Sequence, residues 1–203
     1  MNLIANVQGL RKTFNRSNVL NNISFSLHLH ETLLITGRNG SGKSTLSKIL
    51  ADLLSPTSGT MIVLPGCDSE ERRLHLGFVA PYLQLFEEFT PLEHLELAWR
   101  LRGYSSRPSV GTILDEVGLG AVKKKTVRTL SSGMKQRLKY AVALDHRPRL
   151  LILDEPMANL DVEGVTMVHK VMSDQTSVGA LVVATNNPEE VSKRDHQVDL
   201  NEQ

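Results

Sequence analysis

The chain has 203 residues, of which 40% are hydrophobic, and its 23 basic residues nearly balance its 22 acidic ones. This composition is typical of a globular protein of one domain. The net charge of +1 excludes the strongly basic surface of a dedicated nucleic-acid binder. No apolar segment approaches the length of about 18 residues that a membrane helix needs, and the first residues lack the pattern of a signal peptide. With Cys67 as its single cysteine, the chain is predicted to be cytoplasmic.

The first part of the chain predicts a small antiparallel sheet. Apolar and polar residues alternate with a period of two at 3–10 and 22–30, and a third short strand is expected at 58–66. Four later apolar segments are continuous instead, and they cover 32–36, 76–80, 149–156 and 180–185. Continuous apolar strands are typical of a parallel sheet that is covered on both faces. A last strand is expected at 196–200.

Helices are expected between these strands. Apolar residues from Leu46 to Leu54 follow helical spacing directly after the first continuous segment. Thr90, Pro91 and Glu93 form the capping pattern of a helix that ends at Gly103. Further helices are expected at 112–117 and 132–145, and a loop at 105–111. The predicted class is therefore α/β, with a mainly parallel sheet, a small antiparallel sheet and an inserted helical part.

A glycine-rich segment predicts a phosphate site. The segment GRNGSGKST, from Gly37 to Thr45, matches the pattern G-x-x-x-x-G-K-[ST] between a predicted strand and a predicted helix. Glycines let backbone N–H groups surround phosphate oxygens, and the helix N-terminus adds partial positive charge. Lys43 is expected to reach the β- and γ-phosphates, and Ser44 to offer its hydroxyl to Mg²⁺. The residues expected to bind the nucleotide are Gly37, Asn39, Gly40, Ser41, Gly42, Lys43, Ser44 and Thr45.

Two acidic residues end the apolar segment LLILDE, which runs from Leu150 to Glu155. Beside a phosphate loop, Asp154 is expected to hold Mg²⁺. Glu155 is expected to act as the general base that polarises the attacking water. The alternative is an acid pair that simply faces solvent at the end of a strand.

The segment LSSGMKQR, from Leu130 to Arg137, resembles the signature sequence of ATP-binding-cassette (ABC) ATPases, LSGGQ-x-QR. The resemblance covers essentially the whole chain and implies a P-loop NTPase fold that binds ATP and Mg²⁺. It implies one ABC ATPase domain over 1–203, with a nucleotide-binding core at 1–81 and 146–203 and a helical subdomain at 82–145. In this family the signature closes on the γ-phosphate held by a partner cassette, so a homodimer or heterodimer is expected.

The resemblance also implies further roles. Ser131 and Gly133 match the signature positions that contact the partner's nucleotide, whereas Ser132 and Met134 replace the family's glycine and glutamine. Asp161, in the segment PMANLD, matches a residue at the dimer interface. Phe14 matches the aromatic residue that stacks on adenine, although a phenylalanine at this place is also typical of a core.

Two positions depart from the family pattern. The hinge into the helical subdomain usually carries a glutamine that touches Mg²⁺, but its place here holds Pro81 and a glutamine, Gln84, follows three residues later. Either Gln84 reaches back to the metal, or the contact is lost to water. Apolar residues around it, Tyr82, Leu83, Leu85 and Phe86, are expected either to line the groove where a membrane subunit docks or to form subdomain core.

The second departure lies in TNNPEE, where Asn186 replaces the histidine that contacts the γ-phosphate in relatives. An asparagine amide can donate a hydrogen bond but cannot carry a titrating proton. The loss of one such donor costs about 10²–10³ in rate, and partial replacement should cost less. We therefore expect slow hydrolysis with Asn186 as part of the catalytic set, the alternative being a regulatory cassette with little turnover.

The resemblance predicts the ATPase subunit of an ABC transporter, at the inner face of the cell membrane through a separate transmembrane permease. The short segment after the last predicted strand resembles compact exporter cassettes, including the heme-exporter ATPases of cytochrome c maturation. A DNA-maintenance ATPase would share both motifs, but it carries long coiled coils, and the sequence has no heptad array. The transported substrate is not predicted, because the permease selects it.

Overall fold

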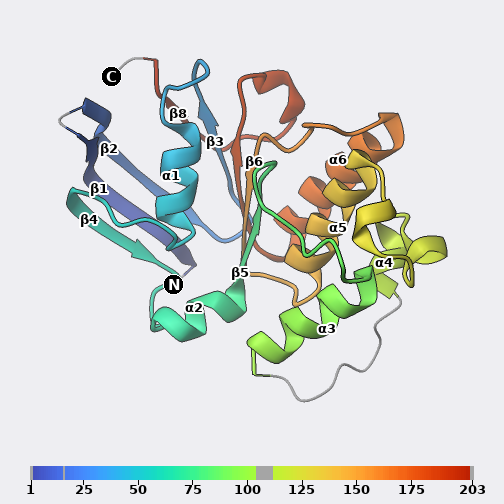
Figure 1. Cartoon of the computed structure of the whole chain (residues 1–203). Helices are drawn as coiled ribbons and strands as arrows, with labels where there is room; N and C mark the ends of the chain where they lie inside the picture. Colours follow the sequence, from blue (N-terminus) through green and yellow to red (C-terminus); the bar gives the residue numbers. More distant parts are fainter. Residues whose placement is uncertain (1, 16, 104–111, 202–203) are drawn as a thin grey trace.

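A computed structural model describes residues 2–15, 17–103 and 112–201 (Figure 1). The loop expected at 105–111 lies outside the described residues. The elements in chain order are β1 (Leu3–Phe14), β2 (Ser17–His28), β3 (Thr32–Thr36), α1 (Lys43–Leu50), β4 (Ser58–Val63), α2 (Ser69–His75), β5 (Leu76–Val79), α3 (Pro91–Leu101), α4 (Thr112–Glu116), η1 (Gly120–Val122), η2 (Val127–Thr129), α5 (Ser132–Leu144), β6 (Leu150–Asp154), α6 (Val162–Val178), β7 (Ala180–Ala184), η3 (Pro188–Glu190) and β8 (His196–Asp199).

The described strands form two sheets. The antiparallel sheet has the order β2-β1-β4, and the parallel sheet has the order β5-β6-β7-β3-β8. Helix α1 lies between the two sheets, whereas α3, α4, α5 and α6 lie on the other side of the parallel sheet (Figure 1). The parallel strands end at one common edge, so the segments that follow β3, β6 and β7 come together there. This arrangement confirms the predicted α/β class.

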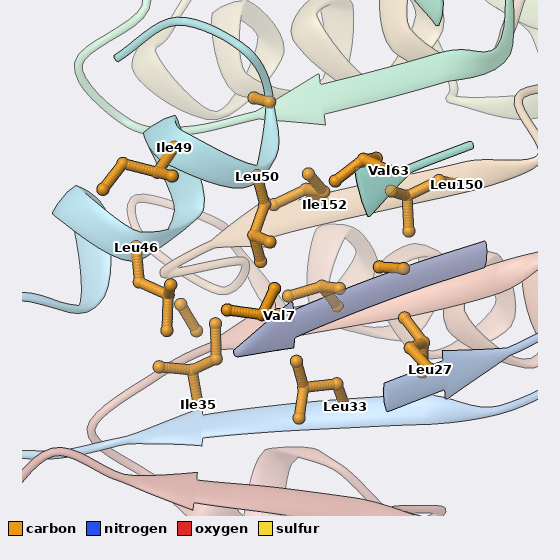
Figure 2. Packing of buried hydrophobic residues seen from close by; sticks show 14 of the residues in the cluster. Val7, Leu27, Leu33, Ile35, Leu46, Ile49, Leu50, Val63, Leu150 and Ile152 are labelled. Carbon is orange, nitrogen blue, oxygen red and sulfur yellow. The ribbon is translucent and has the colours of Figure 1, made fainter. Parts of the chain in front are cut away.

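The parallel strands are apolar along their whole length because both of their faces are covered. Every residue of β3, β6 and β7 is buried. One cluster, which includes Leu33, Ile35, Leu46 and Ile152, fills the space between the two sheets and α1 (Figure 2). A second cluster joins the opposite face of the parallel sheet to α3, α4, α5 and α6.

The helices begin at the expected caps, and some of their limits differ from the predictions. Thr90 accepts a hydrogen bond from the Glu93 amide and starts α3 with a capping box. Helix α1 ends at Leu50, so the expectation that it continues to Leu54 is wrong, and Leu53 is 61% exposed. The short helix α2 was not predicted, although Asp68 and Glu71 form its capping box.

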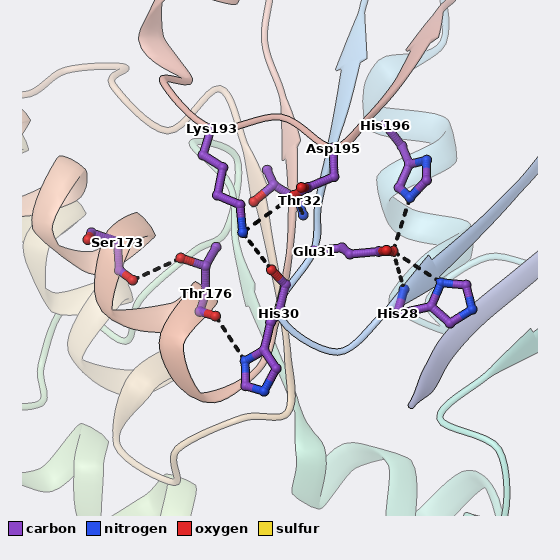
Figure 3. A network of polar contacts seen from close by, with 9 residues as sticks. All are labelled: His28, His30, Glu31, Thr32, Ser173, Thr176, Lys193, Asp195 and His196. Atoms are coloured by element: carbon purple, nitrogen blue, oxygen red, sulfur yellow. Dashed lines mark hydrogen bonds and ion pairs between the residues drawn. The ribbon is translucent and has the colours of Figure 1, made fainter. Parts of the chain in front are cut away.

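A polar network ties strands together at the amino edge of the parallel sheet (Figure 3). The carboxylate of Glu31 accepts a hydrogen bond from the His28 amide at 2.7 Å and lies 3.0 Å from Nε2 of His196. Asp195 accepts a hydrogen bond from the Thr32 amide at 2.8 Å. The network therefore joins the end of β2 to the beginnings of β3 and β8.

No helix among the described residues has both the length and the apolar character needed to cross a membrane. The division into a core at 1–81 and 146–203 and a helical subdomain at 82–145 stays a prediction. The second apolar cluster contains residues from both parts, for example Leu153 from β6 and Leu138 from α5.

Candidate functional site

The glycine-rich segment lies at the carboxyl end of β3 and leads into α1, as predicted. Gly42 precedes α1 with φ of 103°, a left-handed conformation that side chains rarely adopt. A Cβ atom at this position would lie 2.9 Å from the carbonyl oxygen of Val19 on β2. The segment must therefore carry glycine here, because β2 packs directly behind it.

Lys43 is the first residue of α1, and its side chain folds back over the glycine-rich segment. Its Nζ donates hydrogen bonds to the carbonyl oxygens of Gly37, at 2.9 Å, and Arg38, at 3.3 Å. The same Nζ lies 3.3 Å from a carboxylate oxygen of Glu155, the residue that follows β6. Two motifs that are far apart in the sequence therefore meet at one point.

Asp154 is the last residue of β6, and it is fully buried. No hydrogen bond of regular geometry reaches either of its carboxylate oxygens among the described residues, and the Tyr82 hydroxyl is the one polar group shown to interact with this carboxylate. The hydroxyl of Ser41 in the glycine-rich segment is also buried and lacks a described partner. Buried polar atoms rarely lack a partner in proteins, so these groups fit a polar ligand bound at this place.

The orphaned oxygens of Asp154 fit a hard cation such as Mg²⁺. Mg²⁺ is usually held by one or two carboxylates together with waters and the phosphates of a substrate, and it does not need a cage of protein ligands. The described residues contain no cluster of three or more acidic, histidine or cysteine side chains that could hold a metal alone. Asp154 therefore suits a metal that arrives with a nucleotide, and the expected contribution of the Ser44 hydroxyl stays a prediction.

The sequence did not predict that Tyr82 lies beside this carboxylate. Burial raises the pKa of the Tyr82 hydroxyl, and the negative charge of Asp154 raises it further. The Nζ of Lys48 lies 4.2 Å from the centre of the Tyr82 ring. No sequence pattern singles out a tyrosine after Pro81 for this place.

The segment after β7 places Asn186 at the same edge of the sheet. Strand β7 lies between β6 and β3 and ends at Ala184, so the following residues emerge between the acidic pair and the glycine-rich segment. Thr185 is buried, and its hydroxyl donates a hydrogen bond to Glu190 at 2.8 Å. Asn186 is exposed directly after it.

The signature segment forms the N-terminal end of α5. Ser131 is the N-cap of α5, and its hydroxyl accepts a hydrogen bond from the Met134 amide at 3.2 Å. Ser132, the first residue of the helix, is exposed, and Gly133 is half-buried. Further along α5, Arg137 donates to both carboxylate oxygens of Asp161 at 2.7 Å, a pair that the sequence did not predict.

Phe14 and Gln84 are the expected site residues with the least support from the geometry. Phe14 ends β1 and is 43% exposed, with the Nζ of Lys12 at 4.8 Å from its ring centre. Gln84 lines a groove together with Leu83 and Leu85. The structure shows no contact between Gln84 and Asp154, so the expected metal contact of Gln84 stays a prediction.

A family model described as "ABC transporter" matches residues 20–158. The uncharacterized ABC transporter ATP-binding proteins YcbN and YxlF of Bacillus subtilis are 37% and 38% identical over 84% and 89% of this chain. The chain spans 56% and 61% of their lengths. The lantibiotic transport ATP-binding protein SrtF of Streptococcus pyogenes is 32% identical over 89% of this chain and 79% of its own length.

A search of solved structures finds the same fold. A structure of the ATP binding subunit of an ABC transporter covers 97% of this chain and 85% of its own, with a TM-score of 0.85 and 27% sequence identity. The residues matched by the family model include the glycine-rich segment, the signature segment and the acidic pair. The chain belongs to the ABC transporter family, as an ATP-binding domain.

Proposed function

We propose that the chain binds and hydrolyses ATP as the ATP-binding subunit of an ABC transporter, and thereby drives a separate membrane protein. The observation that carries this proposal is the meeting of Lys43, Asp154 and Glu155 at one edge of the parallel sheet. A nucleotide phosphate at this edge would find a buried ammonium group, an orphaned carboxylate for its Mg²⁺ and a second carboxylate for water.

Each residue has a separate task in this proposal. Lys43 and the backbone N–H groups of the glycine-rich segment hold the β- and γ-phosphates. Asp154 and Ser44 would hold Mg²⁺, which would neutralise charge on the phosphates. Glu155 accepts a proton from the water that attacks the γ-phosphorus, while the bond to the bridging oxygen breaks and ADP leaves. Asn186 donates a hydrogen bond toward the γ-phosphate through its amide.

The expected turnover is slow because Asn186 cannot take part in proton transfer. The experiment is steady-state hydrolysis of ATP with Mg²⁺ by the wild type, Glu155→Gln and Asn186→His. We expect measurable turnover that Glu155→Gln abolishes and that Asn186→His raises. If the wild type binds ATP but releases phosphate no faster than Glu155→Gln, the catalytic proposal fails for this chain, and a nucleotide-gated regulatory cassette becomes the better description.

A dimer of cassettes is part of the same proposal. The signature at the start of α5 offers the N–H groups of a helix N-terminus and the hydroxyls of Ser131 and Ser132. Gly133 is the next residue of the helix. Such an exposed helix start is suited to a γ-phosphate that a second cassette holds. Light scattering of Glu155→Gln with and without ATP is expected to show a dimer with ATP only. The partner can be a second copy or a different cassette.

A groove between the end of α1, β5 and α5 is the proposed place for the permease. It has a volume of about 460 Å³ and is lined by apolar residues, among them Leu53, Phe78, Leu83 and Leu85. Four basic residues and one acidic residue, Asp52, also line it. An apolar segment that carries a carboxylate would complement this lining. The variant Leu83→Asp is expected to keep the hydrolysis of the isolated chain but to lose assembly with a co-expressed permease in detergent. This docking would place the chain at the inner face of the cell membrane.

Export is proposed from the resemblance of the sequence to compact exporter cassettes. The names of the relatives do not agree on a direction, because SrtF is named for lantibiotic transport and CysA of Brucella melitensis for sulfate/thiosulfate import. The heme-exporter type that the sequence suggests stays a prediction. Because the permease selects the substrate, the cargo is tested with the membrane partner and not with this chain.

A further inference from the structure

Tyr140 lies on α5, inside the helical part of the chain, and reaches the loop that carries Glu155. Its side chain is fully buried, and its hydroxyl donates a hydrogen bond of 2.9 Å to the carbonyl oxygen of Pro156. Pro156 directly follows Glu155. A single hydrogen bond therefore connects α5 to the peptide unit next to the proposed general base.

Glu155 needs such support because its backbone is strained. Its φ is +46°, in the left-handed region that residues other than glycine rarely adopt, and the proline that follows restricts it further. Strain of this kind persists where the surrounding structure fixes it. On one side, the Glu155 amide donates to the carbonyl of Ala184 at 2.8 Å, and on the other side Tyr140 holds Pro156.

The same face of α5 meets this loop at other points. Gly133, Arg137 and Tyr140 are spaced by four and three residues, so they share one helix face. Arg137 binds Asp161 with two hydrogen bonds of 2.7 Å, and Gly133 faces Asn159, whose carbonyl oxygen would lie 3.4 Å from an added Cβ. The loop from 155 to 161 is therefore fixed against α5 at several places.

We propose that Tyr140 is a positioning residue for Glu155: its buried hydroxyl holds the Pro156 carbonyl and so keeps the Glu155 carboxylate directed at Lys43 and the phosphate site. Burial raises the pKa of Tyr140, so the hydroxyl keeps its proton and remains a donor at neutral pH. Without it, the buried Pro156 carbonyl would have no described partner, and the strained peptide would relax. This proposal rests on the proposed hydrolysis for its kinetic consequence only.

The test compares Tyr140→Phe with a matched control at the opposite edge of the sheet. Gln175 is also buried, and its amide donates a hydrogen bond of 3.0 Å to the carbonyl of another proline, Pro148. Gln175→Met removes a similar buried bond far from Glu155. We expect Tyr140→Phe to lower kcat about tenfold with KM for ATP within about twofold of the wild type, because a misplaced catalytic group affects the chemical step. Gln175→Met should leave kcat unchanged.

A second readout does not depend on turnover. The Glu155 amide donates to the carbonyl of Ala184, and the Ala158 amide donates to the carbonyl of Glu155. Hydrogen exchange of these two amides, measured without nucleotide, reports how well this loop is ordered. In Tyr140→Phe we expect both amides to exchange about tenfold faster relative to the Leu151 amide in the centre of the sheet. Unchanged relative exchange, or equal losses of kcat in both variants, overturns the proposal. A wild type without turnover would overturn the proposed hydrolysis instead, while the exchange rates still decide the role of Tyr140.

Discussion

Lys43 and Glu155 form an ion pair across the phosphate site, with 3.3 Å between Nζ and the nearer carboxylate oxygen. The two residues belong to different motifs. Lys43 begins α1 after β3, and Glu155 directly follows β6. A γ-phosphate that enters the site would compete with Glu155 for the ammonium group. Nucleotide binding is therefore expected to open this pair.

This pair predicts a loss of nucleotide affinity in Lys43→Met. A hydrogen bond to a charged group contributes about 1.5–3 kcal/mol, which corresponds to about 10–100-fold in the dissociation constant for ATP. A fluorescent ATP analogue measures this affinity by titration. Lys193→Met is the control, because Lys193 lies in the polar network at the other edge of the sheet. Equal affinity in both variants would contradict the role of Lys43.

Gly42→Ala is expected to damage the phosphate loop by steric contact. Its Cβ atom would approach the Val19 carbonyl to 2.9 Å, in addition to the strain of a positive φ. Gly66→Ala is a matched control, because Gly66 has φ of 89° and an added Cβ would meet nothing within 4 Å. The control should lose about 1–2 kcal/mol of unfolding free energy from backbone strain alone. Gly42→Ala should lose more in urea unfolding and should also bind ATP more weakly.

The Arg137–Asp161 pair predicts a contribution to acid stability. The hydrogen bond from the Gly164 amide, and then the charge of Arg137, hold the pKa of Asp161 below its usual value. Stability from this group is present above the unfolded pKa of about 3.9 and is lost as the pH falls through the lower folded value. Asp161→Asn should lower the melting temperature at pH 7 and flatten its decline below about pH 4. A parallel decline in variant and wild type would contradict this link.

His146 predicts a pH dependence at milder acidity. Burial, and then the charge of Arg102, lower its pKa to about 4. The folded chain therefore keeps this histidine neutral while the unfolded chain takes up a proton below about pH 6.5, so stability falls as the pH drops from 6.5 toward 4. The loss from this group should reach roughly 3 kcal/mol.

His146→Gln provides the test, because an amide can still donate to the Leu76 carbonyl that lies 3.1 Å from Nε2 of His146. Denaturant unfolding at several pH values measures the free energy of unfolding. The variant should show a smaller loss between pH 6.5 and 4 than the wild type. The same slope in both proteins would show that other groups determine the acid response.

The sequence predicts the parts of the site that local patterns define. The continuous apolar segments of β3 and β6, the glycines before Lys43 and the acids after Leu153 each follow from strand burial or phosphate chemistry. These two parallel strands are separated in the sheet by β7 alone, so the residues at their carboxyl ends meet at one edge.

The contacts of α5 could not be predicted in the same way. Tyr140 fits an apolar helix face by spacing, and nothing in that pattern says that its hydroxyl will reach Pro156. The place of Tyr82 beside Asp154 depends on how the hinge leaves β5, which the sequence does not define. The early end of α1 coincides with a left-handed backbone at Asp52, whose φ is 60°, and Leu53 then donates its amide to the Lys48 carbonyl while its side chain stays exposed.

The order of strands has a consequence for how the chain folds as it is synthesised. Strand β3, which leads into the glycine-rich segment, pairs with β7 and β8, and Thr32 bonds to a residue 163 positions later. Contacts of such separation form late and slow the folding reaction. The hairpin of β1 and β2 can form early, but β3 has no strand beside it until residues 180–199 have left the ribosome. A nascent chain that stops before this point should therefore be a substrate for chaperones and proteases, and ATP should not protect it.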